Sequence, residues 1–311
     1  MQPRYHTPIF HIFITLFCFV FLGTGITVMA HQSKKPAQYL ELSESFITKK
    51  PDVAYNRSVF QNINVTADAF LVFDITNNKE IFSKNANIQK PIASLTKIVS
   101  ANVILETVPK ETVFTITPYA EKLNGLHGLQ TGESYTRDEL LEFALGISSN
   151  TAIATITDDS TSFVSSMNAY AKKVTKRDTM YFRNTTGLDT EDNQSGGVGT
   201  VYDVLDVLQD GTKRFPELFT SSIKNNFFIS TQGKMFPNTN ITLDHIPSVR
   251  SSKTGFTNRA GGTLAFIFEA EPGRTLAIII LDSTFSDRFT DGEKLIQATL
   301  QSLSSDFYDF N

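Results

Sequence analysis

Three short groups of polar residues could together carry out acyl transfer. Ser94 and Lys97 are three residues apart, so a helix would place both side chains on one face, about one turn apart. A serine hydroxyl is a poor nucleophile until a base takes its proton, and a lysine can be that base only when neutral. Bringing a lysine from its ordinary pKa near ~10.4 to about 7.5 requires about 4 kcal/mol of differential interaction. Burial and a nearby positive charge both lower a lysine pKa.

The two other groups follow in a fixed order along the chain. Ser148-Ser149-Asn150 lies 54 residues after Ser94, and Lys253-Thr254-Gly255 begins 105 residues after Ser148. Each string alone carries little information, since Asn150 by itself could be a helix cap. The first string is expected at a helix start, the second at a helix end and the third ahead of a strand. Together they form the S-x-x-K, S-x-N, K-T-G signature of penicillin-recognising serine enzymes.

On these motifs the sequence resembles the D-alanyl-D-alanine carboxypeptidase branch of the low-molecular-mass penicillin-binding proteins. The resemblance runs from about residue 65 to 295 and is carried by residues 91–105, 128–152, 182–189 and 253–262. It implies that Ser94 is the nucleophile and Lys97 its base. It also implies that Ser148 relays a proton toward the leaving amine, and that Asn150 holds Lys97 and contacts the peptide bond of the substrate.

The resemblance also assigns the substrate-binding residues. Lys253 and Thr254 would receive the terminal carboxylate of the D-alanine, and Lys253 would supply the like charge near the catalytic lysine. Gly255 lacks a Cβ and would let the substrate lie along the strand edge. The backbone amides of Ser94 and Phe256 would form an oxyanion hole.

The chain departs from the family pattern at one position near the third motif. Many members carry a basic residue between two asparagines where this chain has Thr239. This departure weakens the expected binding of a carboxylate and favours a broader substrate range. Arg250 is a candidate to compensate, although a strand could also direct its side chain away from the site.

The expected activity is therefore that of a serine D-alanyl-D-alanine carboxypeptidase, which removes the terminal D-alanine from peptidoglycan stem pentapeptides through an acyl-enzyme on Ser94. A D,D-endopeptidase acting on cross-links uses the same residues and stays open. A class A-like β-lactamase is disfavoured because residues 182–189 contain no glutamate in the required setting. A non-catalytic peptidoglycan-binding protein would not need the pair of Ser94 and Lys97.

Composition and charge exclude several other classes. The 311 residues carry 28 Lys and Arg against 32 Asp and Glu, a formal charge of −4, so a nucleic-acid partner is not expected. The one cysteine, Cys18, and the scarcity of histidines argue against a metal site, and no cofactor is expected. The expected partners are peptidoglycan peptide stems, and β-lactams as acylating inhibitors.

The elements that would position these motifs can be read from the apolar pattern. Two hairpins are expected, over 68–74 with 79–84 and over 262–271 with 274–282, the second turning at Pro272-Gly273. Their strands are almost continuously apolar, so helices should cover both faces of the sheet. Helices are expected over 92–106, over 140–145 behind a capping box at Thr136, and over 161–174, 200–209 and 288–302. The fold class is therefore α+β and penicillin-binding or serine β-lactamase-like, with an antiparallel sheet from both termini and an inserted helical region.

The N-terminal residues carry an apolar segment that addresses the chain to a membrane. Residues 8–30 contain no acidic or basic side chain other than His11. Their length falls between a cleaved signal peptide and a membrane span, so residues 1–30 could be either. Residues 31–60 then read as a tether and 61–311 as the D,D-peptidase domain. We expect the protein in the extracytoplasmic cell envelope, secreted or attached to the membrane through its N-terminus.

Overall fold

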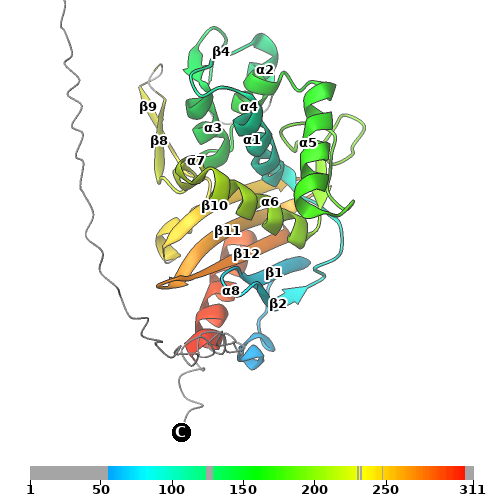
Figure 1. Cartoon of the computed structure of the whole chain (residues 1–311), viewed down its shortest axis with the longest axis vertical. Helices are drawn as coiled ribbons and strands as arrows, with labels where there is room; N and C mark the ends of the chain where they lie inside the picture. Colours follow the sequence, from blue (N-terminus) through cyan, green and yellow to red (C-terminus); the bar gives the residue numbers. More distant parts are fainter. Residues whose placement is uncertain (1–54, 124–128, 230, 232, 247, 305–311) are drawn as a thin grey trace, which may run out of the picture. The chain divides into compact units, whose positions relative to one another are not determined.

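The computed structural model describes residues 55–304, except residues 124–128, 230, 232 and 247 (Figure 1). The expected signal peptide or anchor, residues 1–30, and most of the expected tether lie outside the described residues. In the part that is described, none of the helices combines the length and apolar character needed to cross a membrane. Residues 57–60 form a short 3₁₀ helix, η1 (Arg57–Phe60), whose Phe60 ring stacks on Phe82.

A five-stranded antiparallel sheet forms the centre of the fold. Its strand order is β10-β11-β12-β1-β2, so the two expected hairpins are confirmed and lie side by side. They join because β1 pairs with β12, with Val72 opposite Ile278. The sheet is thus built from both ends of the described chain, as expected. The strands are β1 (Ala69–Asp74), β2 (Lys79–Lys84), β10 (Val249–Thr257), β11 (Gly261–Glu271) and β12 (Arg274–Ser283).

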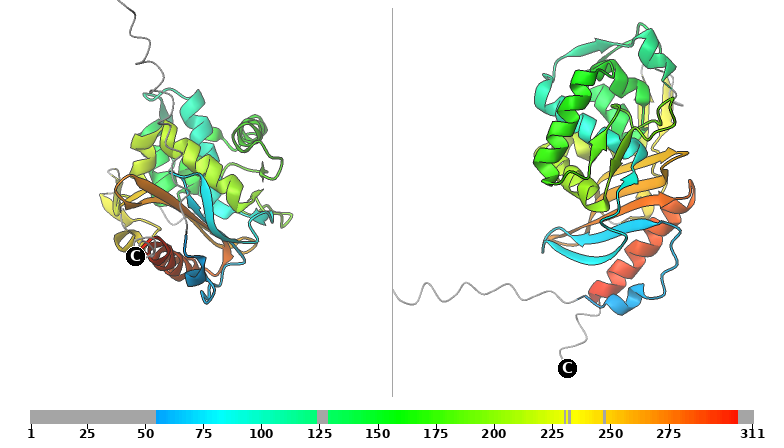
Figure 2. Two further views of the ribbon diagram at one scale, coloured as in Figure 1. Left: turned by 60° about the horizontal axis from the view of Figure 1, so that its bottom comes forward. Right: turned by 90° about the vertical axis from the view of Figure 1, so that its right-hand side faces the viewer.

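Both faces of this sheet are buried, which explains why its strands are apolar at successive positions. Leu71 and Ile279 face one side, while Val72 and Ile278 face the other, as the two-residue repeat of a strand requires. The helical region covers the first face, and α8 (Asp287–Ser304) lies on the second (Figure 2). The sheet is therefore a rigid middle layer from which side chains can reach a site at its edge.

The helical region occupies the chain between β2 and β10, and the helices expected there are confirmed. The capping box at Thr136 is present, because its side chain accepts from the Glu139 amide and Glu139 accepts in return. The helices are α1 (Thr96–Thr107), α2 (Pro118–Lys122), α3 (Arg137–Gly146), α4 (Asn150–Thr157), α5 (Thr161–Thr175), α6 (Val201–Arg214) and α7 (Pro216–Ser221), with 3₁₀ turns η2 (Ala93–Leu95) and η4 (Leu243–His245).

Several short strands were not predicted from the sequence. They are only two to four residues long, too short to show the alternation of apolar and polar residues that marks a strand in the sequence. One small sheet joins β3 (Lys90–Pro91), β7 (Gly197–Gly199) and β6 (Tyr181–Phe182), and two hairpins pair β4 (Val113–Thr115) with β5 (Ser134–Thr136) and β8 (Asn226–Ile229) with β9 (Lys234–Pro237).

Candidate active site

Ser94 and Lys97 lie together at the start of α1. The helix begins at Thr96 rather than near residue 92, and Ser94 sits on the preceding 3₁₀ turn η2. The Nζ of Lys97 is 2.8 Å from the Oγ of Ser94, within hydrogen-bond reach. Lys97 is fully buried, whereas Ser94 is half-buried and lines a cavity of about 550 Å³. The hydroxyl is therefore open to a substrate while its neighbouring amine is shielded from water.

The partners of Lys97 are polar but uncharged. Its Nζ lies 2.6 Å from the Oδ1 of Asn150 and 2.9 Å from the backbone carbonyl oxygen of Thr186. Burial lowers the pKa of Lys97 to about 7, since hydrogen bonds to neutral oxygens do not repay the loss of hydration of an ammonium. Asn150 does not cap α4, because Ser149 is the N-cap residue. Thr186 was not predicted as a site residue, although it lies in the segment 182–189 that carries the family resemblance.

Ser148 and Lys253 form a second pair across the same cavity. The Nζ of Lys253 is 2.9 Å from the Oγ of Ser148 and 2.8 Å from the carbonyl oxygen of Thr254. Burial, together with the positive charges of Lys97 and Arg288, lowers the pKa of Lys253 well below its ordinary value. Burial is the main cause for both amines, and the like charge expected between them adds to it, since the positive charge of Lys97 lowers the pKa of Lys253 further.

Backbone geometry beside the two serines is unusual. Ala93, which precedes Ser94, has φ +47°, and Ser148 itself has φ +59°. Residues with side chains rarely adopt this left-handed region, and such strain tends to gather at functional sites. Both hydroxyls are thus presented from turns that the surrounding packing must hold in place.

The third motif lies inside β10 rather than ahead of a strand. β10 is an edge strand of the central sheet, so one side of it is available for a substrate to pair with. A Cβ on Gly255 would come 2.8 Å from the backbone nitrogen of Ser94 and 2.5 Å from the Oγ1 of Thr263. The glycine therefore allows β10 to pack directly against the turn that carries the nucleophile. Phe256, 43% exposed, follows at the rim of the cavity.

Thr239 faces the cavity from a turn held by its two asparagine neighbours. The side-chain amide of Asn238 donates to two backbone carbonyls, and that of Asn240 donates to the Oγ of Ser252. The hydroxyl of Thr239 accepts from the hydroxyl of Thr254 at 2.7 Å. The position that is basic in many family members thus carries a neutral hydroxyl beside the K-T-G threonine.

The cation that lines the cavity is Arg288 rather than Arg250. Arg250 forms an ion pair with Glu269 on the neighbouring strand and is not among the residues that line the cavity. Arg288 comes from the first turn of α8, and its guanidinium lies 4.4 Å from the ring centre of Phe285 and 4.3 Å from that of Phe289. Burial lowers the pKa of Arg288 to about 10, so it remains charged at neutral pH. No sequence motif marks this arginine, because the fold alone brings α8 to the cavity.

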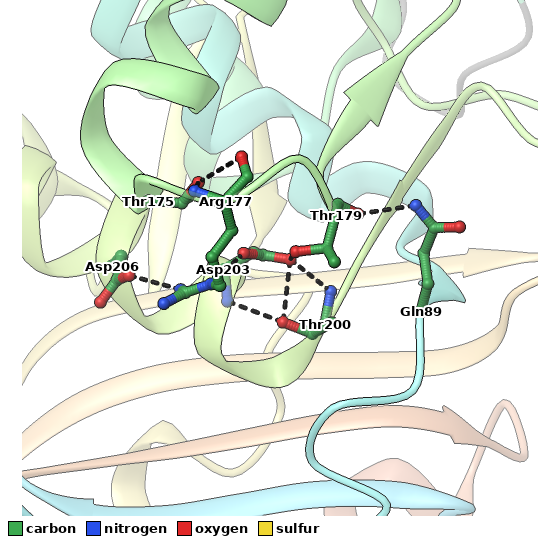
Figure 3. A network of polar contacts seen from close by, with 7 residues as sticks. All are labelled: Gln89, Thr175, Arg177, Thr179, Thr200, Asp203 and Asp206. Atoms are coloured by element: carbon green, nitrogen blue, oxygen red, sulfur yellow. Dashed lines mark hydrogen bonds and ion pairs between the residues drawn. The ribbon is translucent and has the colours of Figure 1, made fainter.

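A separate cluster of charged and polar groups holds the chain that leads to the nucleophile (Figure 3). The carboxylate of Asp203 accepts from the backbone and hydroxyl of Thr200, from the hydroxyl of Thr179 and from the guanidinium of Arg177. The side chain of Gln89 donates to the carbonyl oxygen of Thr179 at 2.7 Å. This cluster therefore ties the start of α6 to the strand β3, three residues before Ser94.

The chain matches a family model and several curated relatives that are all named as D-alanyl-D-alanine peptidases. The model of a family described as D-alanyl-D-alanine carboxypeptidase matches residues 55–284. A D-alanyl-D-alanine endopeptidase of Pseudomonas aeruginosa is 30% identical over 206 residues, 62% of this chain and 64% of the relative. The D-alanyl-D-alanine carboxypeptidase DacF of Bacillus subtilis is 26% identical over 242 residues, 74% of this chain and 61% of the relative. The matches thus span somewhat less than two thirds of the length of these two relatives.

A solved structure agrees with the expected fold class. Penicillin-binding protein D2 of Listeria monocytogenes, in its cefotaxime-bound form, superposes with a TM-score of 0.69 at 26% identity. The match covers 76% of this chain and 98% of that one. The α+β, penicillin-binding type of fold predicted from the sequence is therefore confirmed.

Proposed function

The chain belongs to the D-alanyl-D-alanine carboxypeptidase family, and on this premise we propose that it is a serine peptidase that removes the terminal D-alanine from peptidoglycan stem pentapeptides. One observation carries the proposal. A fully buried lysine, whose pKa is lowered to about 7, lies 2.8 Å from a serine hydroxyl that faces a cavity. A substantial fraction of Lys97 is then neutral at physiological pH and can take the proton of Ser94.

In the first half of the reaction the Oγ of Ser94 attacks the carbonyl carbon of the penultimate D-alanine. Lys97 accepts the proton, and the backbone amides of Ser94 and Phe256 stabilise the oxyanion. The carbon–nitrogen bond then breaks, and the leaving amine receives a proton by way of Ser148, whose hydroxyl is within 2.9 Å of the Nζ of Lys253. Asn150 keeps Lys97 pointed at the nucleophile through its 2.6 Å contact.

The carboxylate of the leaving D-alanine is held by polar groups that line the same cavity. Arg288 supplies a charge that persists at neutral pH, and the hydroxyl of Thr254, which donates to Thr239 in the structure, can turn to donate to the carboxylate instead. Lys253 gains a proton more readily when a carboxylate is bound, since the opposite charge raises its pKa. Carboxylate binding in this chain thus depends on Arg288, because Thr239 carries no charge.

In the second half of the reaction, water cleaves the ester on Ser94. None of the described residues that line the cavity carries a carboxylate, so the group that class A β-lactamases use to activate this water has no counterpart there. A β-lactam would acylate Ser94 by the same first step, and the ester that it forms would be hydrolysed slowly.

A peptidoglycan substrate implies that the enzyme acts outside the cytoplasm, in the cell envelope. Residues 1–30 would then be the signal peptide or membrane anchor, residues 31–60 a tether and residues 61–311 the D,D-peptidase domain.

Labelling with a fluorescent penicillin tests the proposal. The native protein should form a stable covalent adduct, while Ser94→Ala should form none. Release of D-alanine from a pentapeptide, followed by mass spectrometry, should occur with the native protein alone. Rapid turnover of the penicillin would instead indicate a β-lactamase, and absence of labelling would indicate a non-catalytic binder.

An endopeptidase is the second candidate, because the Pseudomonas aeruginosa relative carries that name. It would use the same residues on a cross-linked peptide, with a second peptide as the leaving group. The two activities differ only in what must fit beyond the scissile bond.

A further inference from the structure

Large apolar side chains that are exposed to solvent gather at one end of the reaction cavity. Ile241, Phe256 and Phe285 are 72%, 43% and 61% exposed, and all three line the cavity that contains Ser94. The rings of Phe256 and Phe285 meet edge to face, with centres 5.0 Å apart, so their orientation is set before any ligand binds. Exposed apolar surface that adjoins a cavity is typical of a ligand contact.

A second cavity, of about 340 Å³, continues from this end of the reaction cavity. The two cavities share Ile241 and Phe285 as wall residues, so they are contiguous. We call the second cavity the leaving-group trough. It lies between the chain at 241–245 and the first turns of α8, and its other wall residues are Thr242, His245, Ser286, Phe289, Thr290 and Glu293.

Arg288 lies between the trough and the part of the reaction cavity where the substrate carboxylate is proposed to bind. Its guanidinium lies against the rings of Phe285 and Phe289, which are both trough walls, while Arg288 itself lines the reaction cavity. In the proposed function the carboxylate of the leaving residue is bound at this arginine. The trough is therefore beside the leaving residue. The methyl group of D-alanine is too small to fill it.

We propose that the leaving-group trough binds the methylene side chain of a D-residue that leaves from a peptide cross-link; this inference rests on the serine peptidase function proposed above. The occupant is a cross-link in which the departing amine belongs to a diamino acid whose amine-bearing carbon also bears a carboxylate. The carboxylate binds at Arg288, as that of D-alanine would. The methylenes then lie between Ile241 and Phe285, and the second peptide leaves past the exposed pair of His245 and Glu293.

The covalent chemistry is unchanged by this occupant. The Oγ of Ser94 forms an ester with the D-alanyl carbonyl carbon, the bond to the departing amine breaks, and that amine takes up the proton released by Ser94. Water then hydrolyses the ester and frees the enzyme. The trough thus acts on selectivity alone, because it contacts a part of the leaving group that D-alanine lacks.

Blocking the trough tests this assignment. Thr290 and Gln297 are both exposed residues of α8, but only Thr290 lines the trough. Each buried methylene is worth roughly a factor of four, so three methylenes in an open trough should favour the cross-link by at least about tenfold. We expect Thr290→Trp to lower the ratio of kcat/KM for a cross-linked peptide dimer to kcat/KM for the pentapeptide by about tenfold or more. The matched control Gln297→Trp should leave both values unchanged.

A peptide ending in D-alanyl-D-norleucine tests the effect of the leaving side chain alone, because it has the methylenes but no second peptide. The native protein should cleave it faster than the D-alanyl-D-alanine peptide, and Thr290→Trp should remove this preference. An unchanged ratio in Thr290→Trp, in protein that still labels stoichiometrically with penicillin, would overturn the assignment and leave the proposed function standing. A preference for D-norleucine without cleavage of the dimer would overturn the cross-link as occupant. Failure of the native protein to label or to release any D-residue would instead overturn the proposed function.

Discussion

Two buried polar clusters in this molecule, one around Asp203 and one around Lys97 and Lys253, have opposite electrostatic balance. Around Asp203, one carboxylate receives hydrogen bonds from a backbone amide, two hydroxyls and a guanidinium. Burial alone would raise its pKa, but these donors outweigh it, and the pKa of Asp203 lies below its ordinary value. Around Lys97 and Lys253, two amines have neutral oxygens as hydrogen-bond partners, and the pKa of each is lowered.

The difference separates a cluster that stabilises the fold from one that prepares a reaction. A buried charge with a full set of partners keeps its charge and fixes its surroundings. A buried amine without an opposite charge gives up its proton, which destabilises the fold slightly but supplies a base at neutral pH. The following predictions test whether the two clusters have these separate roles.

Replacing the base should have the largest effect on activity. Lys97→Met keeps a long apolar chain but removes the amine, so we expect acylation by penicillin to slow about 10³-fold. The free energy of unfolding should stay the same or rise, because an uncompensated buried amine is removed. Stopped-flow acylation and thermal unfolding measure the two quantities. A large loss of stability with little loss of acylation would show that Lys97 is structural.

Breaking the cluster around Asp203 should have the opposite result, a large loss of stability with a small loss of activity. Asp203→Asn keeps the shape but removes the fully buried one of the two carboxylates that pair with Arg177, so we expect the free energy of unfolding to fall by about 3 kcal/mol. Acylation per folded molecule should fall less than tenfold. Asp206→Asn is the matched control, since Asp206 is partly exposed and its pair with Arg177 is worth at most about 1 kcal/mol. Denaturant titrations measure both variants, and equal losses would contradict the central role of Asp203.

Removing the charge of Arg288 should affect substrate binding more than stability. Arg288→Met should lower kcat/KM for the pentapeptide about 10- to 100-fold, since a hydrogen bond to a charged group is worth about 1.5–3 kcal/mol. Arg250→Met removes an arginine outside the cavity and should change kcat/KM less than twofold. Steady-state release of D-alanine measures both. Similar losses in the two variants would mean that general charge, rather than the position of Arg288, matters.

The smallest effects concern pH. The rate constant for acylation should rise about tenfold per pH unit below pH 7 and level off above it, because Lys97 acts in its neutral form and its pKa is about 7. Stability should also rise between pH 7 and about pH 10, since Lys97 and Lys253 regain a pKa of about 10.4 on unfolding and the unfolded chain therefore binds more protons than the folded chain. This rise should be smaller in Lys97→Met.

The Asp203 cluster should show the opposite pH dependence. Its folded pKa lies below the ordinary value, so its contribution is complete above the unfolded pKa and is lost as the pH falls through the folded one. Thermal unfolding at a series of pH values measures both trends, and Asp203→Asn serves as the control in acid. A stability that falls between pH 7 and pH 10 in the native protein would contradict the assignment of Lys97.

The sequence by itself was sufficient for the elements and contacts that depend on local order. The hairpin at Pro272-Gly273 and the capping box at Thr136 follow from turn and cap chemistry within a few residues. The spacing of Ser94 and Lys97 ensures that they meet whenever the chain turns helically between them. The motifs from residue 91 to 262 also identify the family.

Only the tertiary structure decided what surrounds those residues. Arg288 reaches the site from a distant part of the chain and no motif marks it, while Thr186 contributes a backbone oxygen, which its side chain does not reveal. The depth of burial of Lys97, and therefore its pKa, depends on several elements at once. The trough at Ile241 and Phe285 exists because α8 packs beside the turn that follows β9. Spacing along a chain fixes neighbours within a helical turn, whereas solvent exclusion is a property of the whole packed fold.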